Sequence, residues 1–218
     1  SINVARFLPQ SFYYFHAYAR MKRAGAADRL VVCVPSGNFG NITAGLFAAR
    51  MGLPVARFIA ANNRNDIFLQ YLETGVYAPR PSVATVANAM DVGDPSNFAR
   101  ILDLYDGDWR TIRSEISGYS YDDDRIRAAV ARVDRECGYL LDPHGACGYL
   151  ALEEGLKPGE TGLFLETAHP AKFRDTVEPV IGRSVEIPER LRRFMEGEKL
   201  SVGMSADFGD FKDYLLSR

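Results

Sequence analysis

Residues 30–41 of the chain read Leu30-Val31-Val32-Cys33-Val34-Pro35-Ser36-Gly37-Asn38-Phe39-Gly40-Asn41. The segment from Leu30 to Val34 is an uninterrupted apolar run rich in β-branched side chains, which is typical of a strand buried on both faces of a parallel sheet. The polar, glycine-containing segment that follows indicates a tight turn, and the Ala- and Leu-rich residues 42–51 indicate a helix. A second strand over residues 55–60 completes a β-turn-α-β unit, whose crossover is right-handed in nearly all proteins.

The rest of the chain alternates between predicted helices and a third strand over residues 162–166. Apolar periodicity and end signals place helices at residues 7–23, 66–73, 95–104, 109–116, 122–136, 145–154, 170–180 and 188–195. This alternation predicts an α/β fold in three layers, with a mainly parallel sheet flanked by helices. We expect one α/β domain over residues 1–185, followed by a helical tail, 186–218, packed on or near it.

The composition excludes several classes of protein. The chain is 47% hydrophobic and 25% charged, and its 26 Lys and Arg against 28 Asp and Glu give a net charge of −2. No generally polybasic nucleic-acid binder has this balance. No apolar stretch approaches the about 18 residues needed to cross a bilayer, so we expect a cytoplasmic protein with neither a membrane nor a nucleic-acid partner. The three cysteines lack the spacing of a zinc site, and no metal is expected.

The turn Gly37–Asn41 is the first candidate binding site. Glycine lets a backbone approach a ligand closely, and asparagine tolerates left-handed conformations. Backbone N–H groups that converge at the start of a helix favour a phosphate, because the helix dipole is positive there. The glycine patterns of dinucleotide and nucleoside-triphosphate sites are absent. An ordinary tight turn between strand and helix is the alternative.

Thr167, at the end of the third predicted strand, is the second candidate. Ligands of open α/β sheets bind beyond the carboxyl ends of the strands, so Thr167 and the Gly37–Asn41 loop can face one crevice. Thr167 can equally cap the following helix. His144, in the segment Asp142-Pro143-His144, is either a contact at the start of a helix or a site residue.

Five segments in this order resemble threonine synthases, which are pyridoxal-phosphate enzymes of the tryptophan-synthase β-like fold. They are Ser1-Ile2-Asn3-Val4-Ala5-Arg6, Val34-Pro35-Ser36-Gly37-Asn38-Phe39-Gly40-Asn41, Val92-Gly93-Asp94-Pro95-Ser96-Asn97-Phe98, Asp142-Pro143-His144 and Thr167-Ala168-His169-Pro170-Ala171-Lys172-Phe173. The resemblance covers nearly the whole chain but only the C-terminal half of the family. We therefore expect a C-terminal fragment, whose missing partner is the N-terminal half of the same enzyme.

The resemblance implies that the cofactor is pyridoxal 5'-phosphate. Its phosphate would be held by Gly37, Asn38, Phe39, Gly40 and Asn41. Thr167 would be a neutral partner of the pyridine nitrogen, which tunes the cofactor's electron demand. The residues implied in substrate binding are Ser1, Asn3, Arg6, Ser96, Asn97 and His144.

No catalytic residue is expected within this chain. The Schiff-base lysine of the family lies in a Phe-Lys-Asp motif upstream of every segment seen here. The sequence Phe211-Lys212-Asp213 has the same residues, but it follows the phosphate loop instead of preceding it. The resemblance therefore implies that the covalently binding lysine is missing.

The implied reaction of the parent enzyme, a lyase of threonine biosynthesis, converts O-phosphohomoserine and water to threonine and phosphate. The fragment alone is expected to be inactive. Two alternatives stay open. One is another β-replacing or dehydratase enzyme of the same fold, related to cysteine synthase or threonine dehydratase. The other is a non-catalytic module that binds a phosphate-bearing ligand.

Overall fold

A computed structural model describes residues 3–218. The substrate-binding prediction for Ser1 lies outside the described residues. The chain divides into two compact units, 1–185 and 186–218. The first unit contains the sheet and both candidate binding segments, and the second contains the last two helices.

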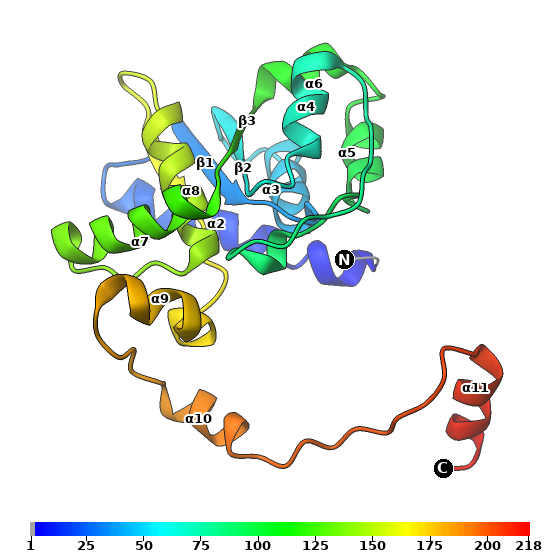
Figure 1. Ribbon diagram of the computed structural model, residues 1–218. Coiled ribbons are helices and arrows are strands. Elements are labelled where there is room, and N and C mark those ends of the chain that lie inside the picture. The colour runs from blue at the N-terminus through cyan, green and yellow to red at the C-terminus, as the bar shows by residue number, and fades with distance from the viewer. Residues whose placement is uncertain (1–2) are drawn as a thin grey trace. The chain divides into compact units, whose positions relative to one another are not determined.

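A parallel sheet forms the centre of the first unit (Figure 1). In the described part of the chain its four strands lie in the order β3-β2-β1-β4, and every neighbouring pair is parallel. Cys33 of β1 pairs with Ile59 of β2 and Phe164 of β4, and β1 is buried along its whole length. The strands are β1 (Leu30–Pro35), β2 (Arg57–Asn62), β3 (Ile116–Ser120) and β4 (Thr161–Phe164).

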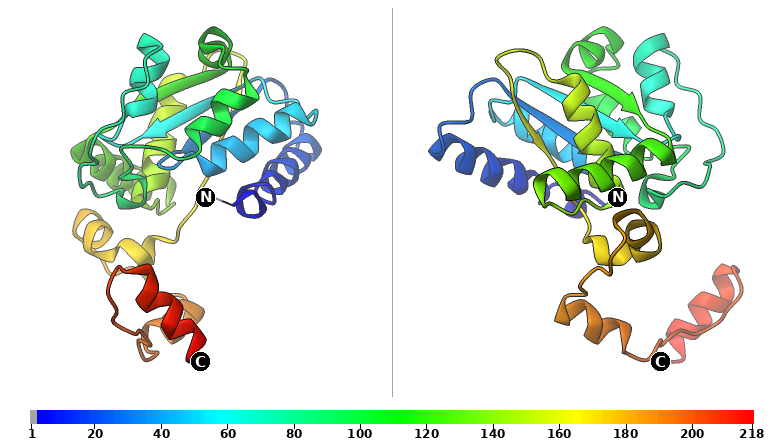
Figure 2. Two further views of the ribbon diagram at one scale, coloured as in Figure 1. Left: turned by 90° about the vertical axis from the view of Figure 1, so that its right-hand side faces the viewer. Right: turned by 60° about the vertical axis from the view of Figure 1, so that its left-hand side comes forward.

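Helices cover both faces of this sheet, so the predicted three-layer α/β fold is confirmed (Figure 2). One face carries α3, and the other carries α8, which contacts all four strands. The helices of the first unit are α1 (Val4–Phe7), α2 (Ser11–Arg23), α3 (Gly40–Arg50), α4 (Ile67–Thr74), η1 (Asn88–Met90), α5 (Phe98–Leu104), α6 (Trp109–Glu115), α7 (Asp123–Cys137), α8 (Pro143–Gly155), η2 (Pro170–Phe173) and α9 (Arg174–Ile181). The second unit contains α10 (Glu189–Met195) and α11 (Phe208–Leu216).

The structure differs from the predicted elements at three places. The helix expected over residues 7–23 is broken at Leu8–Gln10 into α1 and α2. The strand β3 was not predicted, because it is a half-buried edge strand whose small and polar residues lack an apolar run. Its Gly118 lies against Leu69 and Leu72 of α4. The tail contains a second helix, α11, beyond the helix predicted over residues 188–195.

A buried ion pair joins β2 to the turn before β4. The guanidinium of Arg57 donates from Nε to Glu160 Oε1 at 3.0 Å and from Nη2 to Oε2 at 2.6 Å, and Nη2 also reaches the Gly155 carbonyl at 2.6 Å. Both side chains of the pair are at least nine-tenths buried. Hydrogen bonding to Arg57 lowers the pKa of Glu160 to about 2.

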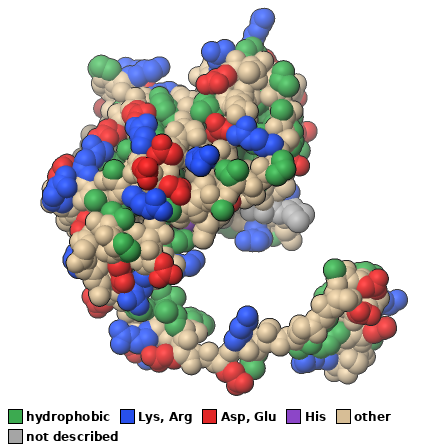
Figure 3. Space-filling view, viewed as in Figure 1, with side chains coloured by type: hydrophobic (Ala, Val, Ile, Leu, Met, Phe, Trp, Pro, Cys, Tyr) green, Lys and Arg blue, Asp and Glu red, His purple; other side chains and the backbone are tan. Residues whose placement is uncertain are grey.

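The surface of the first unit is mixed in charge. Figure 3 shows acidic and basic side chains interleaved over the face that carries α7. Ion pairs there join Arg125 to Glu154, Arg132 to Glu153 and Arg183 to Asp134. No helix among residues 3–218 is both long enough and apolar enough to cross a membrane.

Candidate functional site

The two segments predicted to face one crevice line the same pocket. The loop after β1 and Thr167 after β4 meet where these two neighbouring parallel strands end. The pocket has a volume of about 380 Å³, within the range of small-molecule sites. Its lining residues are Arg6, Gln10, residues 35–42, Ala89, Met90, His144 and Thr167.

The start of α3 forms one wall of the pocket and suits an anion. Phe39, the N-cap residue, has a left-handed backbone with φ of 61°, and no side chain caps the helix. The first N–H groups of a helix have no intrahelical partner, and the dipole adds positive potential there. The Phe39 ring is buried against Phe68, with centroids 4.6 Å apart, which holds this unusual conformation in place.

Gly37 sets how closely the loop approaches η1. A Cβ at this position would lie 2.6 Å from Met90 Cα and 2.9 Å from the Ala89 carbonyl oxygen. Neither is the movable end of a side chain, so residue 37 must be glycine for this packing. The structure therefore gives Gly37 a packing role against η1, and its predicted close approach to a ligand stays a prediction.

Ser96 and Asn97 hold the loop from outside the pocket. Asn38 Oδ1 accepts hydrogen bonds from the Ser96 N–H at 2.6 Å and the Ser96 hydroxyl at 3.0 Å. Asn97 Nδ2 donates to the Asn38 carbonyl at 2.7 Å. Neither Ser96 nor Asn97 is among the lining residues. The structure therefore gives both residues a loop-positioning contact, and their predicted contact with substrate stays a prediction.

Tyr14 supports the loop from α2, a role that the sequence analysis missed. Its hydroxyl donates to Asn41, with the carbonyl oxygen at 2.7 Å and Oδ1 at 2.9 Å. The ring is buried, and burial raises the pKa of Tyr14. Tyr14 lies in an aromatic run whose pattern does not distinguish it from exposed neighbours such as Tyr13.

The segment around α1 supplies two lining residues. Arg6 contributes a guanidinium, and Gln10 has a buried Oε1 without a hydrogen-bond partner among the residues the structure describes. Such an orphaned acceptor suits a ligand that brings a donor. Asn3 caps α1 by accepting a hydrogen bond from the Ala5 N–H at 2.9 Å, and its predicted contact with substrate stays a prediction.

His144 lines the pocket with both ring nitrogens already engaged. Nδ1 lies 2.6 Å from Asp142 Oδ1, and Nε2 accepts a hydrogen bond from the Ala89 N–H at 3.1 Å. The ring is buried and packs edge-on against Phe173, with centroids 4.8 Å apart. A nitrogen of His144 can reach a substrate only if one of these bonds opens.

Thr167 is exposed at the pocket and does not cap the next helix. The cap of η2 is His169, whose Nδ1 accepts from the Ala171 N–H at 3.1 Å. The capping alternative for Thr167 is therefore wrong, and Thr167 is one of the residues that line the pocket.

A polar network fixes the loop that carries η1. Asp91 Oδ1 accepts from Thr85 Oγ1 at 2.7 Å and from Asn63 Nδ2 at 2.8 Å. Asp91 Oδ2 accepts from the Thr85 N–H at 3.0 Å. The buried Asn65 donates to the Val83 carbonyl at 2.9 Å. These bonds order part of the segment between α4 and α5.

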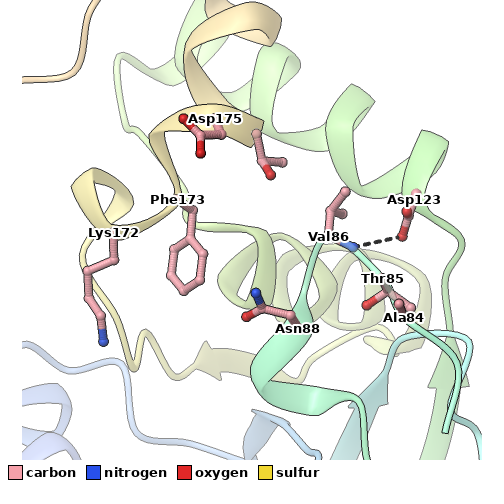
Figure 4. Close-up of a pocket in the computed structure, with 9 residues that line it drawn as sticks. Ala84, Thr85, Val86, Asn88, Asp123, Lys172, Phe173 and Asp175 are labelled. Atoms are coloured by element: carbon pink, nitrogen blue, oxygen red, sulfur yellow. Dashed lines mark hydrogen bonds between the residues drawn. The ribbon is translucent and has the colours of Figure 1, made fainter. Parts of the chain in front are cut away.

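A second pocket of about 350 Å³ lies beside η1 (Figure 4). Asn88 lines this pocket, whereas Ala89 and Met90 line the first, so η1 borders both. Lys172 and Phe173 also line the second pocket. Among the described residues that line the first pocket there is no lysine. In residues 3–218 no group of His, Cys, Asp and Glu is arranged to hold a metal ion.

Comparison with known proteins identifies the family. A family model described as pyridoxal-phosphate dependent enzyme matches residues 13–167, and one described as threonine synthase, C-terminal, matches residues 145–215. The chain is 43% identical to threonine synthase of Haemophilus influenzae over 99% of its length, and 42% identical to that of Escherichia coli over 100% of its length. It spans 50% of the length of each relative.

Solved structures of threonine synthases are also similar to this chain. Threonine synthase from Escherichia coli superposes with a TM-score of 0.88 at 41% identity, covering 99% of this chain and 50% of that one. Pyridoxal-phosphate-bound threonine synthase from Brucella melitensis gives a TM-score of 0.87 at 32% identity, with coverage of 99% and 51%. The resemblance predicted from five sequence segments is confirmed. The chain therefore belongs to the family of pyridoxal-phosphate dependent enzymes.

Proposed function

We propose that residues 1–218 supply the phosphate-binding part of the cofactor site in a threonine synthase. The whole enzyme would convert O-phosphohomoserine and water to threonine and phosphate. One observation carries the proposal: the uncapped start of α3 and the exposed Thr167 line a single pocket. The similarity to threonine synthases over the whole chain supports it.

The residues present fit pyridoxal 5'-phosphate. The N–H groups at the start of α3, from Gly40 to Ile42, would bind its phosphate, because they lie at the positive end of the helix dipole. Gly37 and the left-handed Phe39 shape the loop so that its backbone borders the pocket. Asn38 and Asn41 would act through the bonds that fix this loop.

Thr167 would hold the other end of the cofactor. Pyridoxal phosphate, when bound, supplies an electron sink for carbanion chemistry. A threonine hydroxyl is neutral, so it would leave the pyridine nitrogen less protonated than a carboxylate would. The neighbouring Glu166 is not among the residues that line the pocket.

Arg6 and Gln10 would bind the substrate. O-Phosphohomoserine carries a phosphate and a carboxylate, and a guanidinium recognises either group with paired hydrogen bonds. Gln10 Oε1 is a buried acceptor without a partner in the described chain, which would suit a donor on the ligand. Ser96 and Asn97 would contribute by holding Asn38.

The lysine that binds the cofactor covalently would come from the other half of the enzyme. The five lysines of the chain are Lys22, Lys157, Lys172, Lys199 and Lys212. The lining residues of the pocket, all within the described region, include none of them. The chain alone would then bind the cofactor phosphate without turning over substrate.

The test is an assay of the whole gene product that contains residues 1–218. We expect threonine and phosphate to form from O-phosphohomoserine, and we expect Thr167→Val to lower kcat by about 10-fold or more. Thr74→Val, an exposed threonine on α4, is the matched control and should leave kcat unchanged. Deamination of serine or threonine without use of O-phosphohomoserine would support the dehydratase alternative. Phosphate binding without any turnover would support the non-catalytic module.

A further inference from the structure

Two carboxyl groups interact next to His144, which lines the pocket: Asp142 lies at the start of α8, and Glu166 lies just after β4. Asp142 is fully buried. Asp142 Oδ2 and Glu166 Oε1 are buried, and neither has a donor among the described residues. Burial, the hydrogen bond with Asp142 and the charge of Asp142 raise the pKa of Glu166 to about 9. A proton between the two groups would supply the donor that both oxygens lack.

Gly145 makes room for this pair. A Cβ on Gly145 would overlap the carboxyl group of Glu166. Glycine is otherwise unfavourable inside a helix, where alanine is favoured by about 1 kcal/mol. The glycine in the first turn of α8 therefore lets the Glu166 carboxyl reach Asp142.

The other carboxyl oxygen of Asp142, Oδ1, fixes the position of the His144 ring. Asp142 Oδ1 accepts the His144 N–H at 2.8 Å and lies 2.6 Å from His144 Nδ1. Because Nε2 accepts from the Ala89 N–H, the ring proton must be on Nδ1. Ala89 belongs to η1, which packs against Gly37 of the phosphate-binding loop.

We propose that Glu166 and Asp142 share one proton, and that this carboxyl pair sets the tautomer of His144 and so holds η1 against the phosphate-binding loop. Glu166 is a positioning residue that acts through Asp142 and His144. The inference rests on the proposed function only for the identity of the ligand in the pocket.

The contact between His144 and η1 should depend on pH, because the charge of the Glu166–Asp142 pair does. The titratable groups that face the pair are His144 and Cys147 of α8 and Tyr139 before it. Burial opposes ionisation of Asp142, but hydrogen bonds with His144 and Glu166 outweigh it and lower the pKa of Asp142. Asp142 is therefore the ionised partner, and Glu166 carries the shared proton.

The sign of the pH effect follows from the raised pKa of Glu166. The folded state holds a proton that the unfolded state releases near the ordinary pKa of 4.5. The stabilisation is complete below that value and is lost as the pH rises through about 9. Above it, two adjacent carboxylates repel and the tether on His144 weakens.

Carboxyl ¹³C and imidazole ¹⁵N NMR of the chain test the proposal. We expect one glutamate to titrate near pH 9, and a simultaneous change in the ¹⁵N shifts of an Nδ1–H histidine. Glu166→Gln keeps a donor toward Asp142, so it should preserve the tautomer and remove the alkaline transition. Glu198→Gln, at an exposed position, is the control that should retain both signals.

Gly145→Ala is the sharpest variant, because the atoms it meets are the movable end of a side chain. It should fold, expel the Glu166 carboxyl and move the alkaline titration toward the ordinary value of 4.5. Gly203→Ala, whose Cβ meets nothing, should change neither signal.

Three results would overturn the proposal. They are the absence of any glutamate that titrates near pH 9 in the wild-type chain, an Nε2–H tautomer at His144, and an unchanged alkaline titration in Gly145→Ala. The first two need no variant. If one glutamate titrates near pH 9 but the chain binds neither phosphate nor pyridoxal phosphate, the result supports this inference and contradicts the proposed function.

Discussion

Gly37 and Met90 approach so closely that a Cβ on residue 37 would lie 2.6 Å from Met90 Cα. This contact joins the loop after β1 to η1, a segment far away along the chain. Because η1 is also tethered by His144 and borders the pocket, the shape of the loop at residues 37–41 depends on residues from three separate segments.

Gly37→Ala should disturb this packing. Overpacking against rigid backbone costs about 1–3 kcal/mol of unfolding free energy, and either the loop or η1 must move. We expect that loss in urea unfolding, together with at least about tenfold weaker binding of pyridoxal phosphate by calorimetry. Gly203→Ala, with open space around its Cβ, should match the wild-type chain. Wild-type stability and affinity in Gly37→Ala would contradict the close approach.

Tyr14→Phe should destabilise the chain by about 1–1.5 kcal/mol in urea unfolding. The substitution removes the donor that serves the carbonyl and the side chain of Asn41. Tyr13→Phe is the matched control, because Tyr13 is 65% exposed on the same helix. Equal stability of the two variants would show that the Tyr14 hydroxyl does not support the loop.

Asn97→Ala should weaken pyridoxal-phosphate binding more than Ser96→Ala. Asn97 donates from its side chain to the Asn38 carbonyl, and alanine removes that bond. Ser96→Ala removes only the hydroxyl, because the backbone N–H of residue 96 still reaches Asn38 Oδ1. We expect binding to be about tenfold weaker in Asn97→Ala and about threefold weaker in Ser96→Ala. The reverse order, with a selective rise in KM for Ser96→Ala, would favour direct substrate contact by Ser96.

Acid should destabilise the chain through Glu160. Its pKa is lowered to about 2 by the hydrogen bond with Arg57, so the folded state holds a carboxylate that the unfolded state protonates near 4.5. This stabilisation is present above pH 4.5 and is lost as the pH falls through about 2. Melting temperatures measured across this range should fall less steeply in Glu160→Gln than in the wild type or in the exposed control Glu198→Gln. If the melting temperature falls equally steeply with pH in Glu160→Gln and in the wild type, Glu160 does not contribute to acid destabilisation.

Local patterns predict the part of the fold that is continuous in sequence. The apolar run Leu30–Val34 and the turn after it predict a buried parallel strand, and β1 is buried throughout. Thr167 was placed at a strand end by the same reasoning, and the structure brings it to the loop at residues 37–41. The edge strand β3 was not predicted, because its half-buried small residues form no apolar run.

The supports of the pocket could not be predicted, because they depend on contacts between distant segments. Tyr14, Met90 and Glu166 act through partners on other elements. A single sequence shows the glycine at residue 145, but it does not show which side chain needs the space. Ser96 belongs to a segment that the resemblance identified, yet its contact is with the loop.

The most direct test of the account adds pyridoxal phosphate to the chain of residues 1–218 and follows the backbone amides by NMR before and after borohydride treatment. The account predicts shifts concentrated at residues 37–42 and at Thr167, similar though weaker shifts with inorganic phosphate, and no reduced adduct on any of the five lysines. Shifts elsewhere, or a stoichiometric borohydride-reduced adduct on one of those lysines, would contradict it.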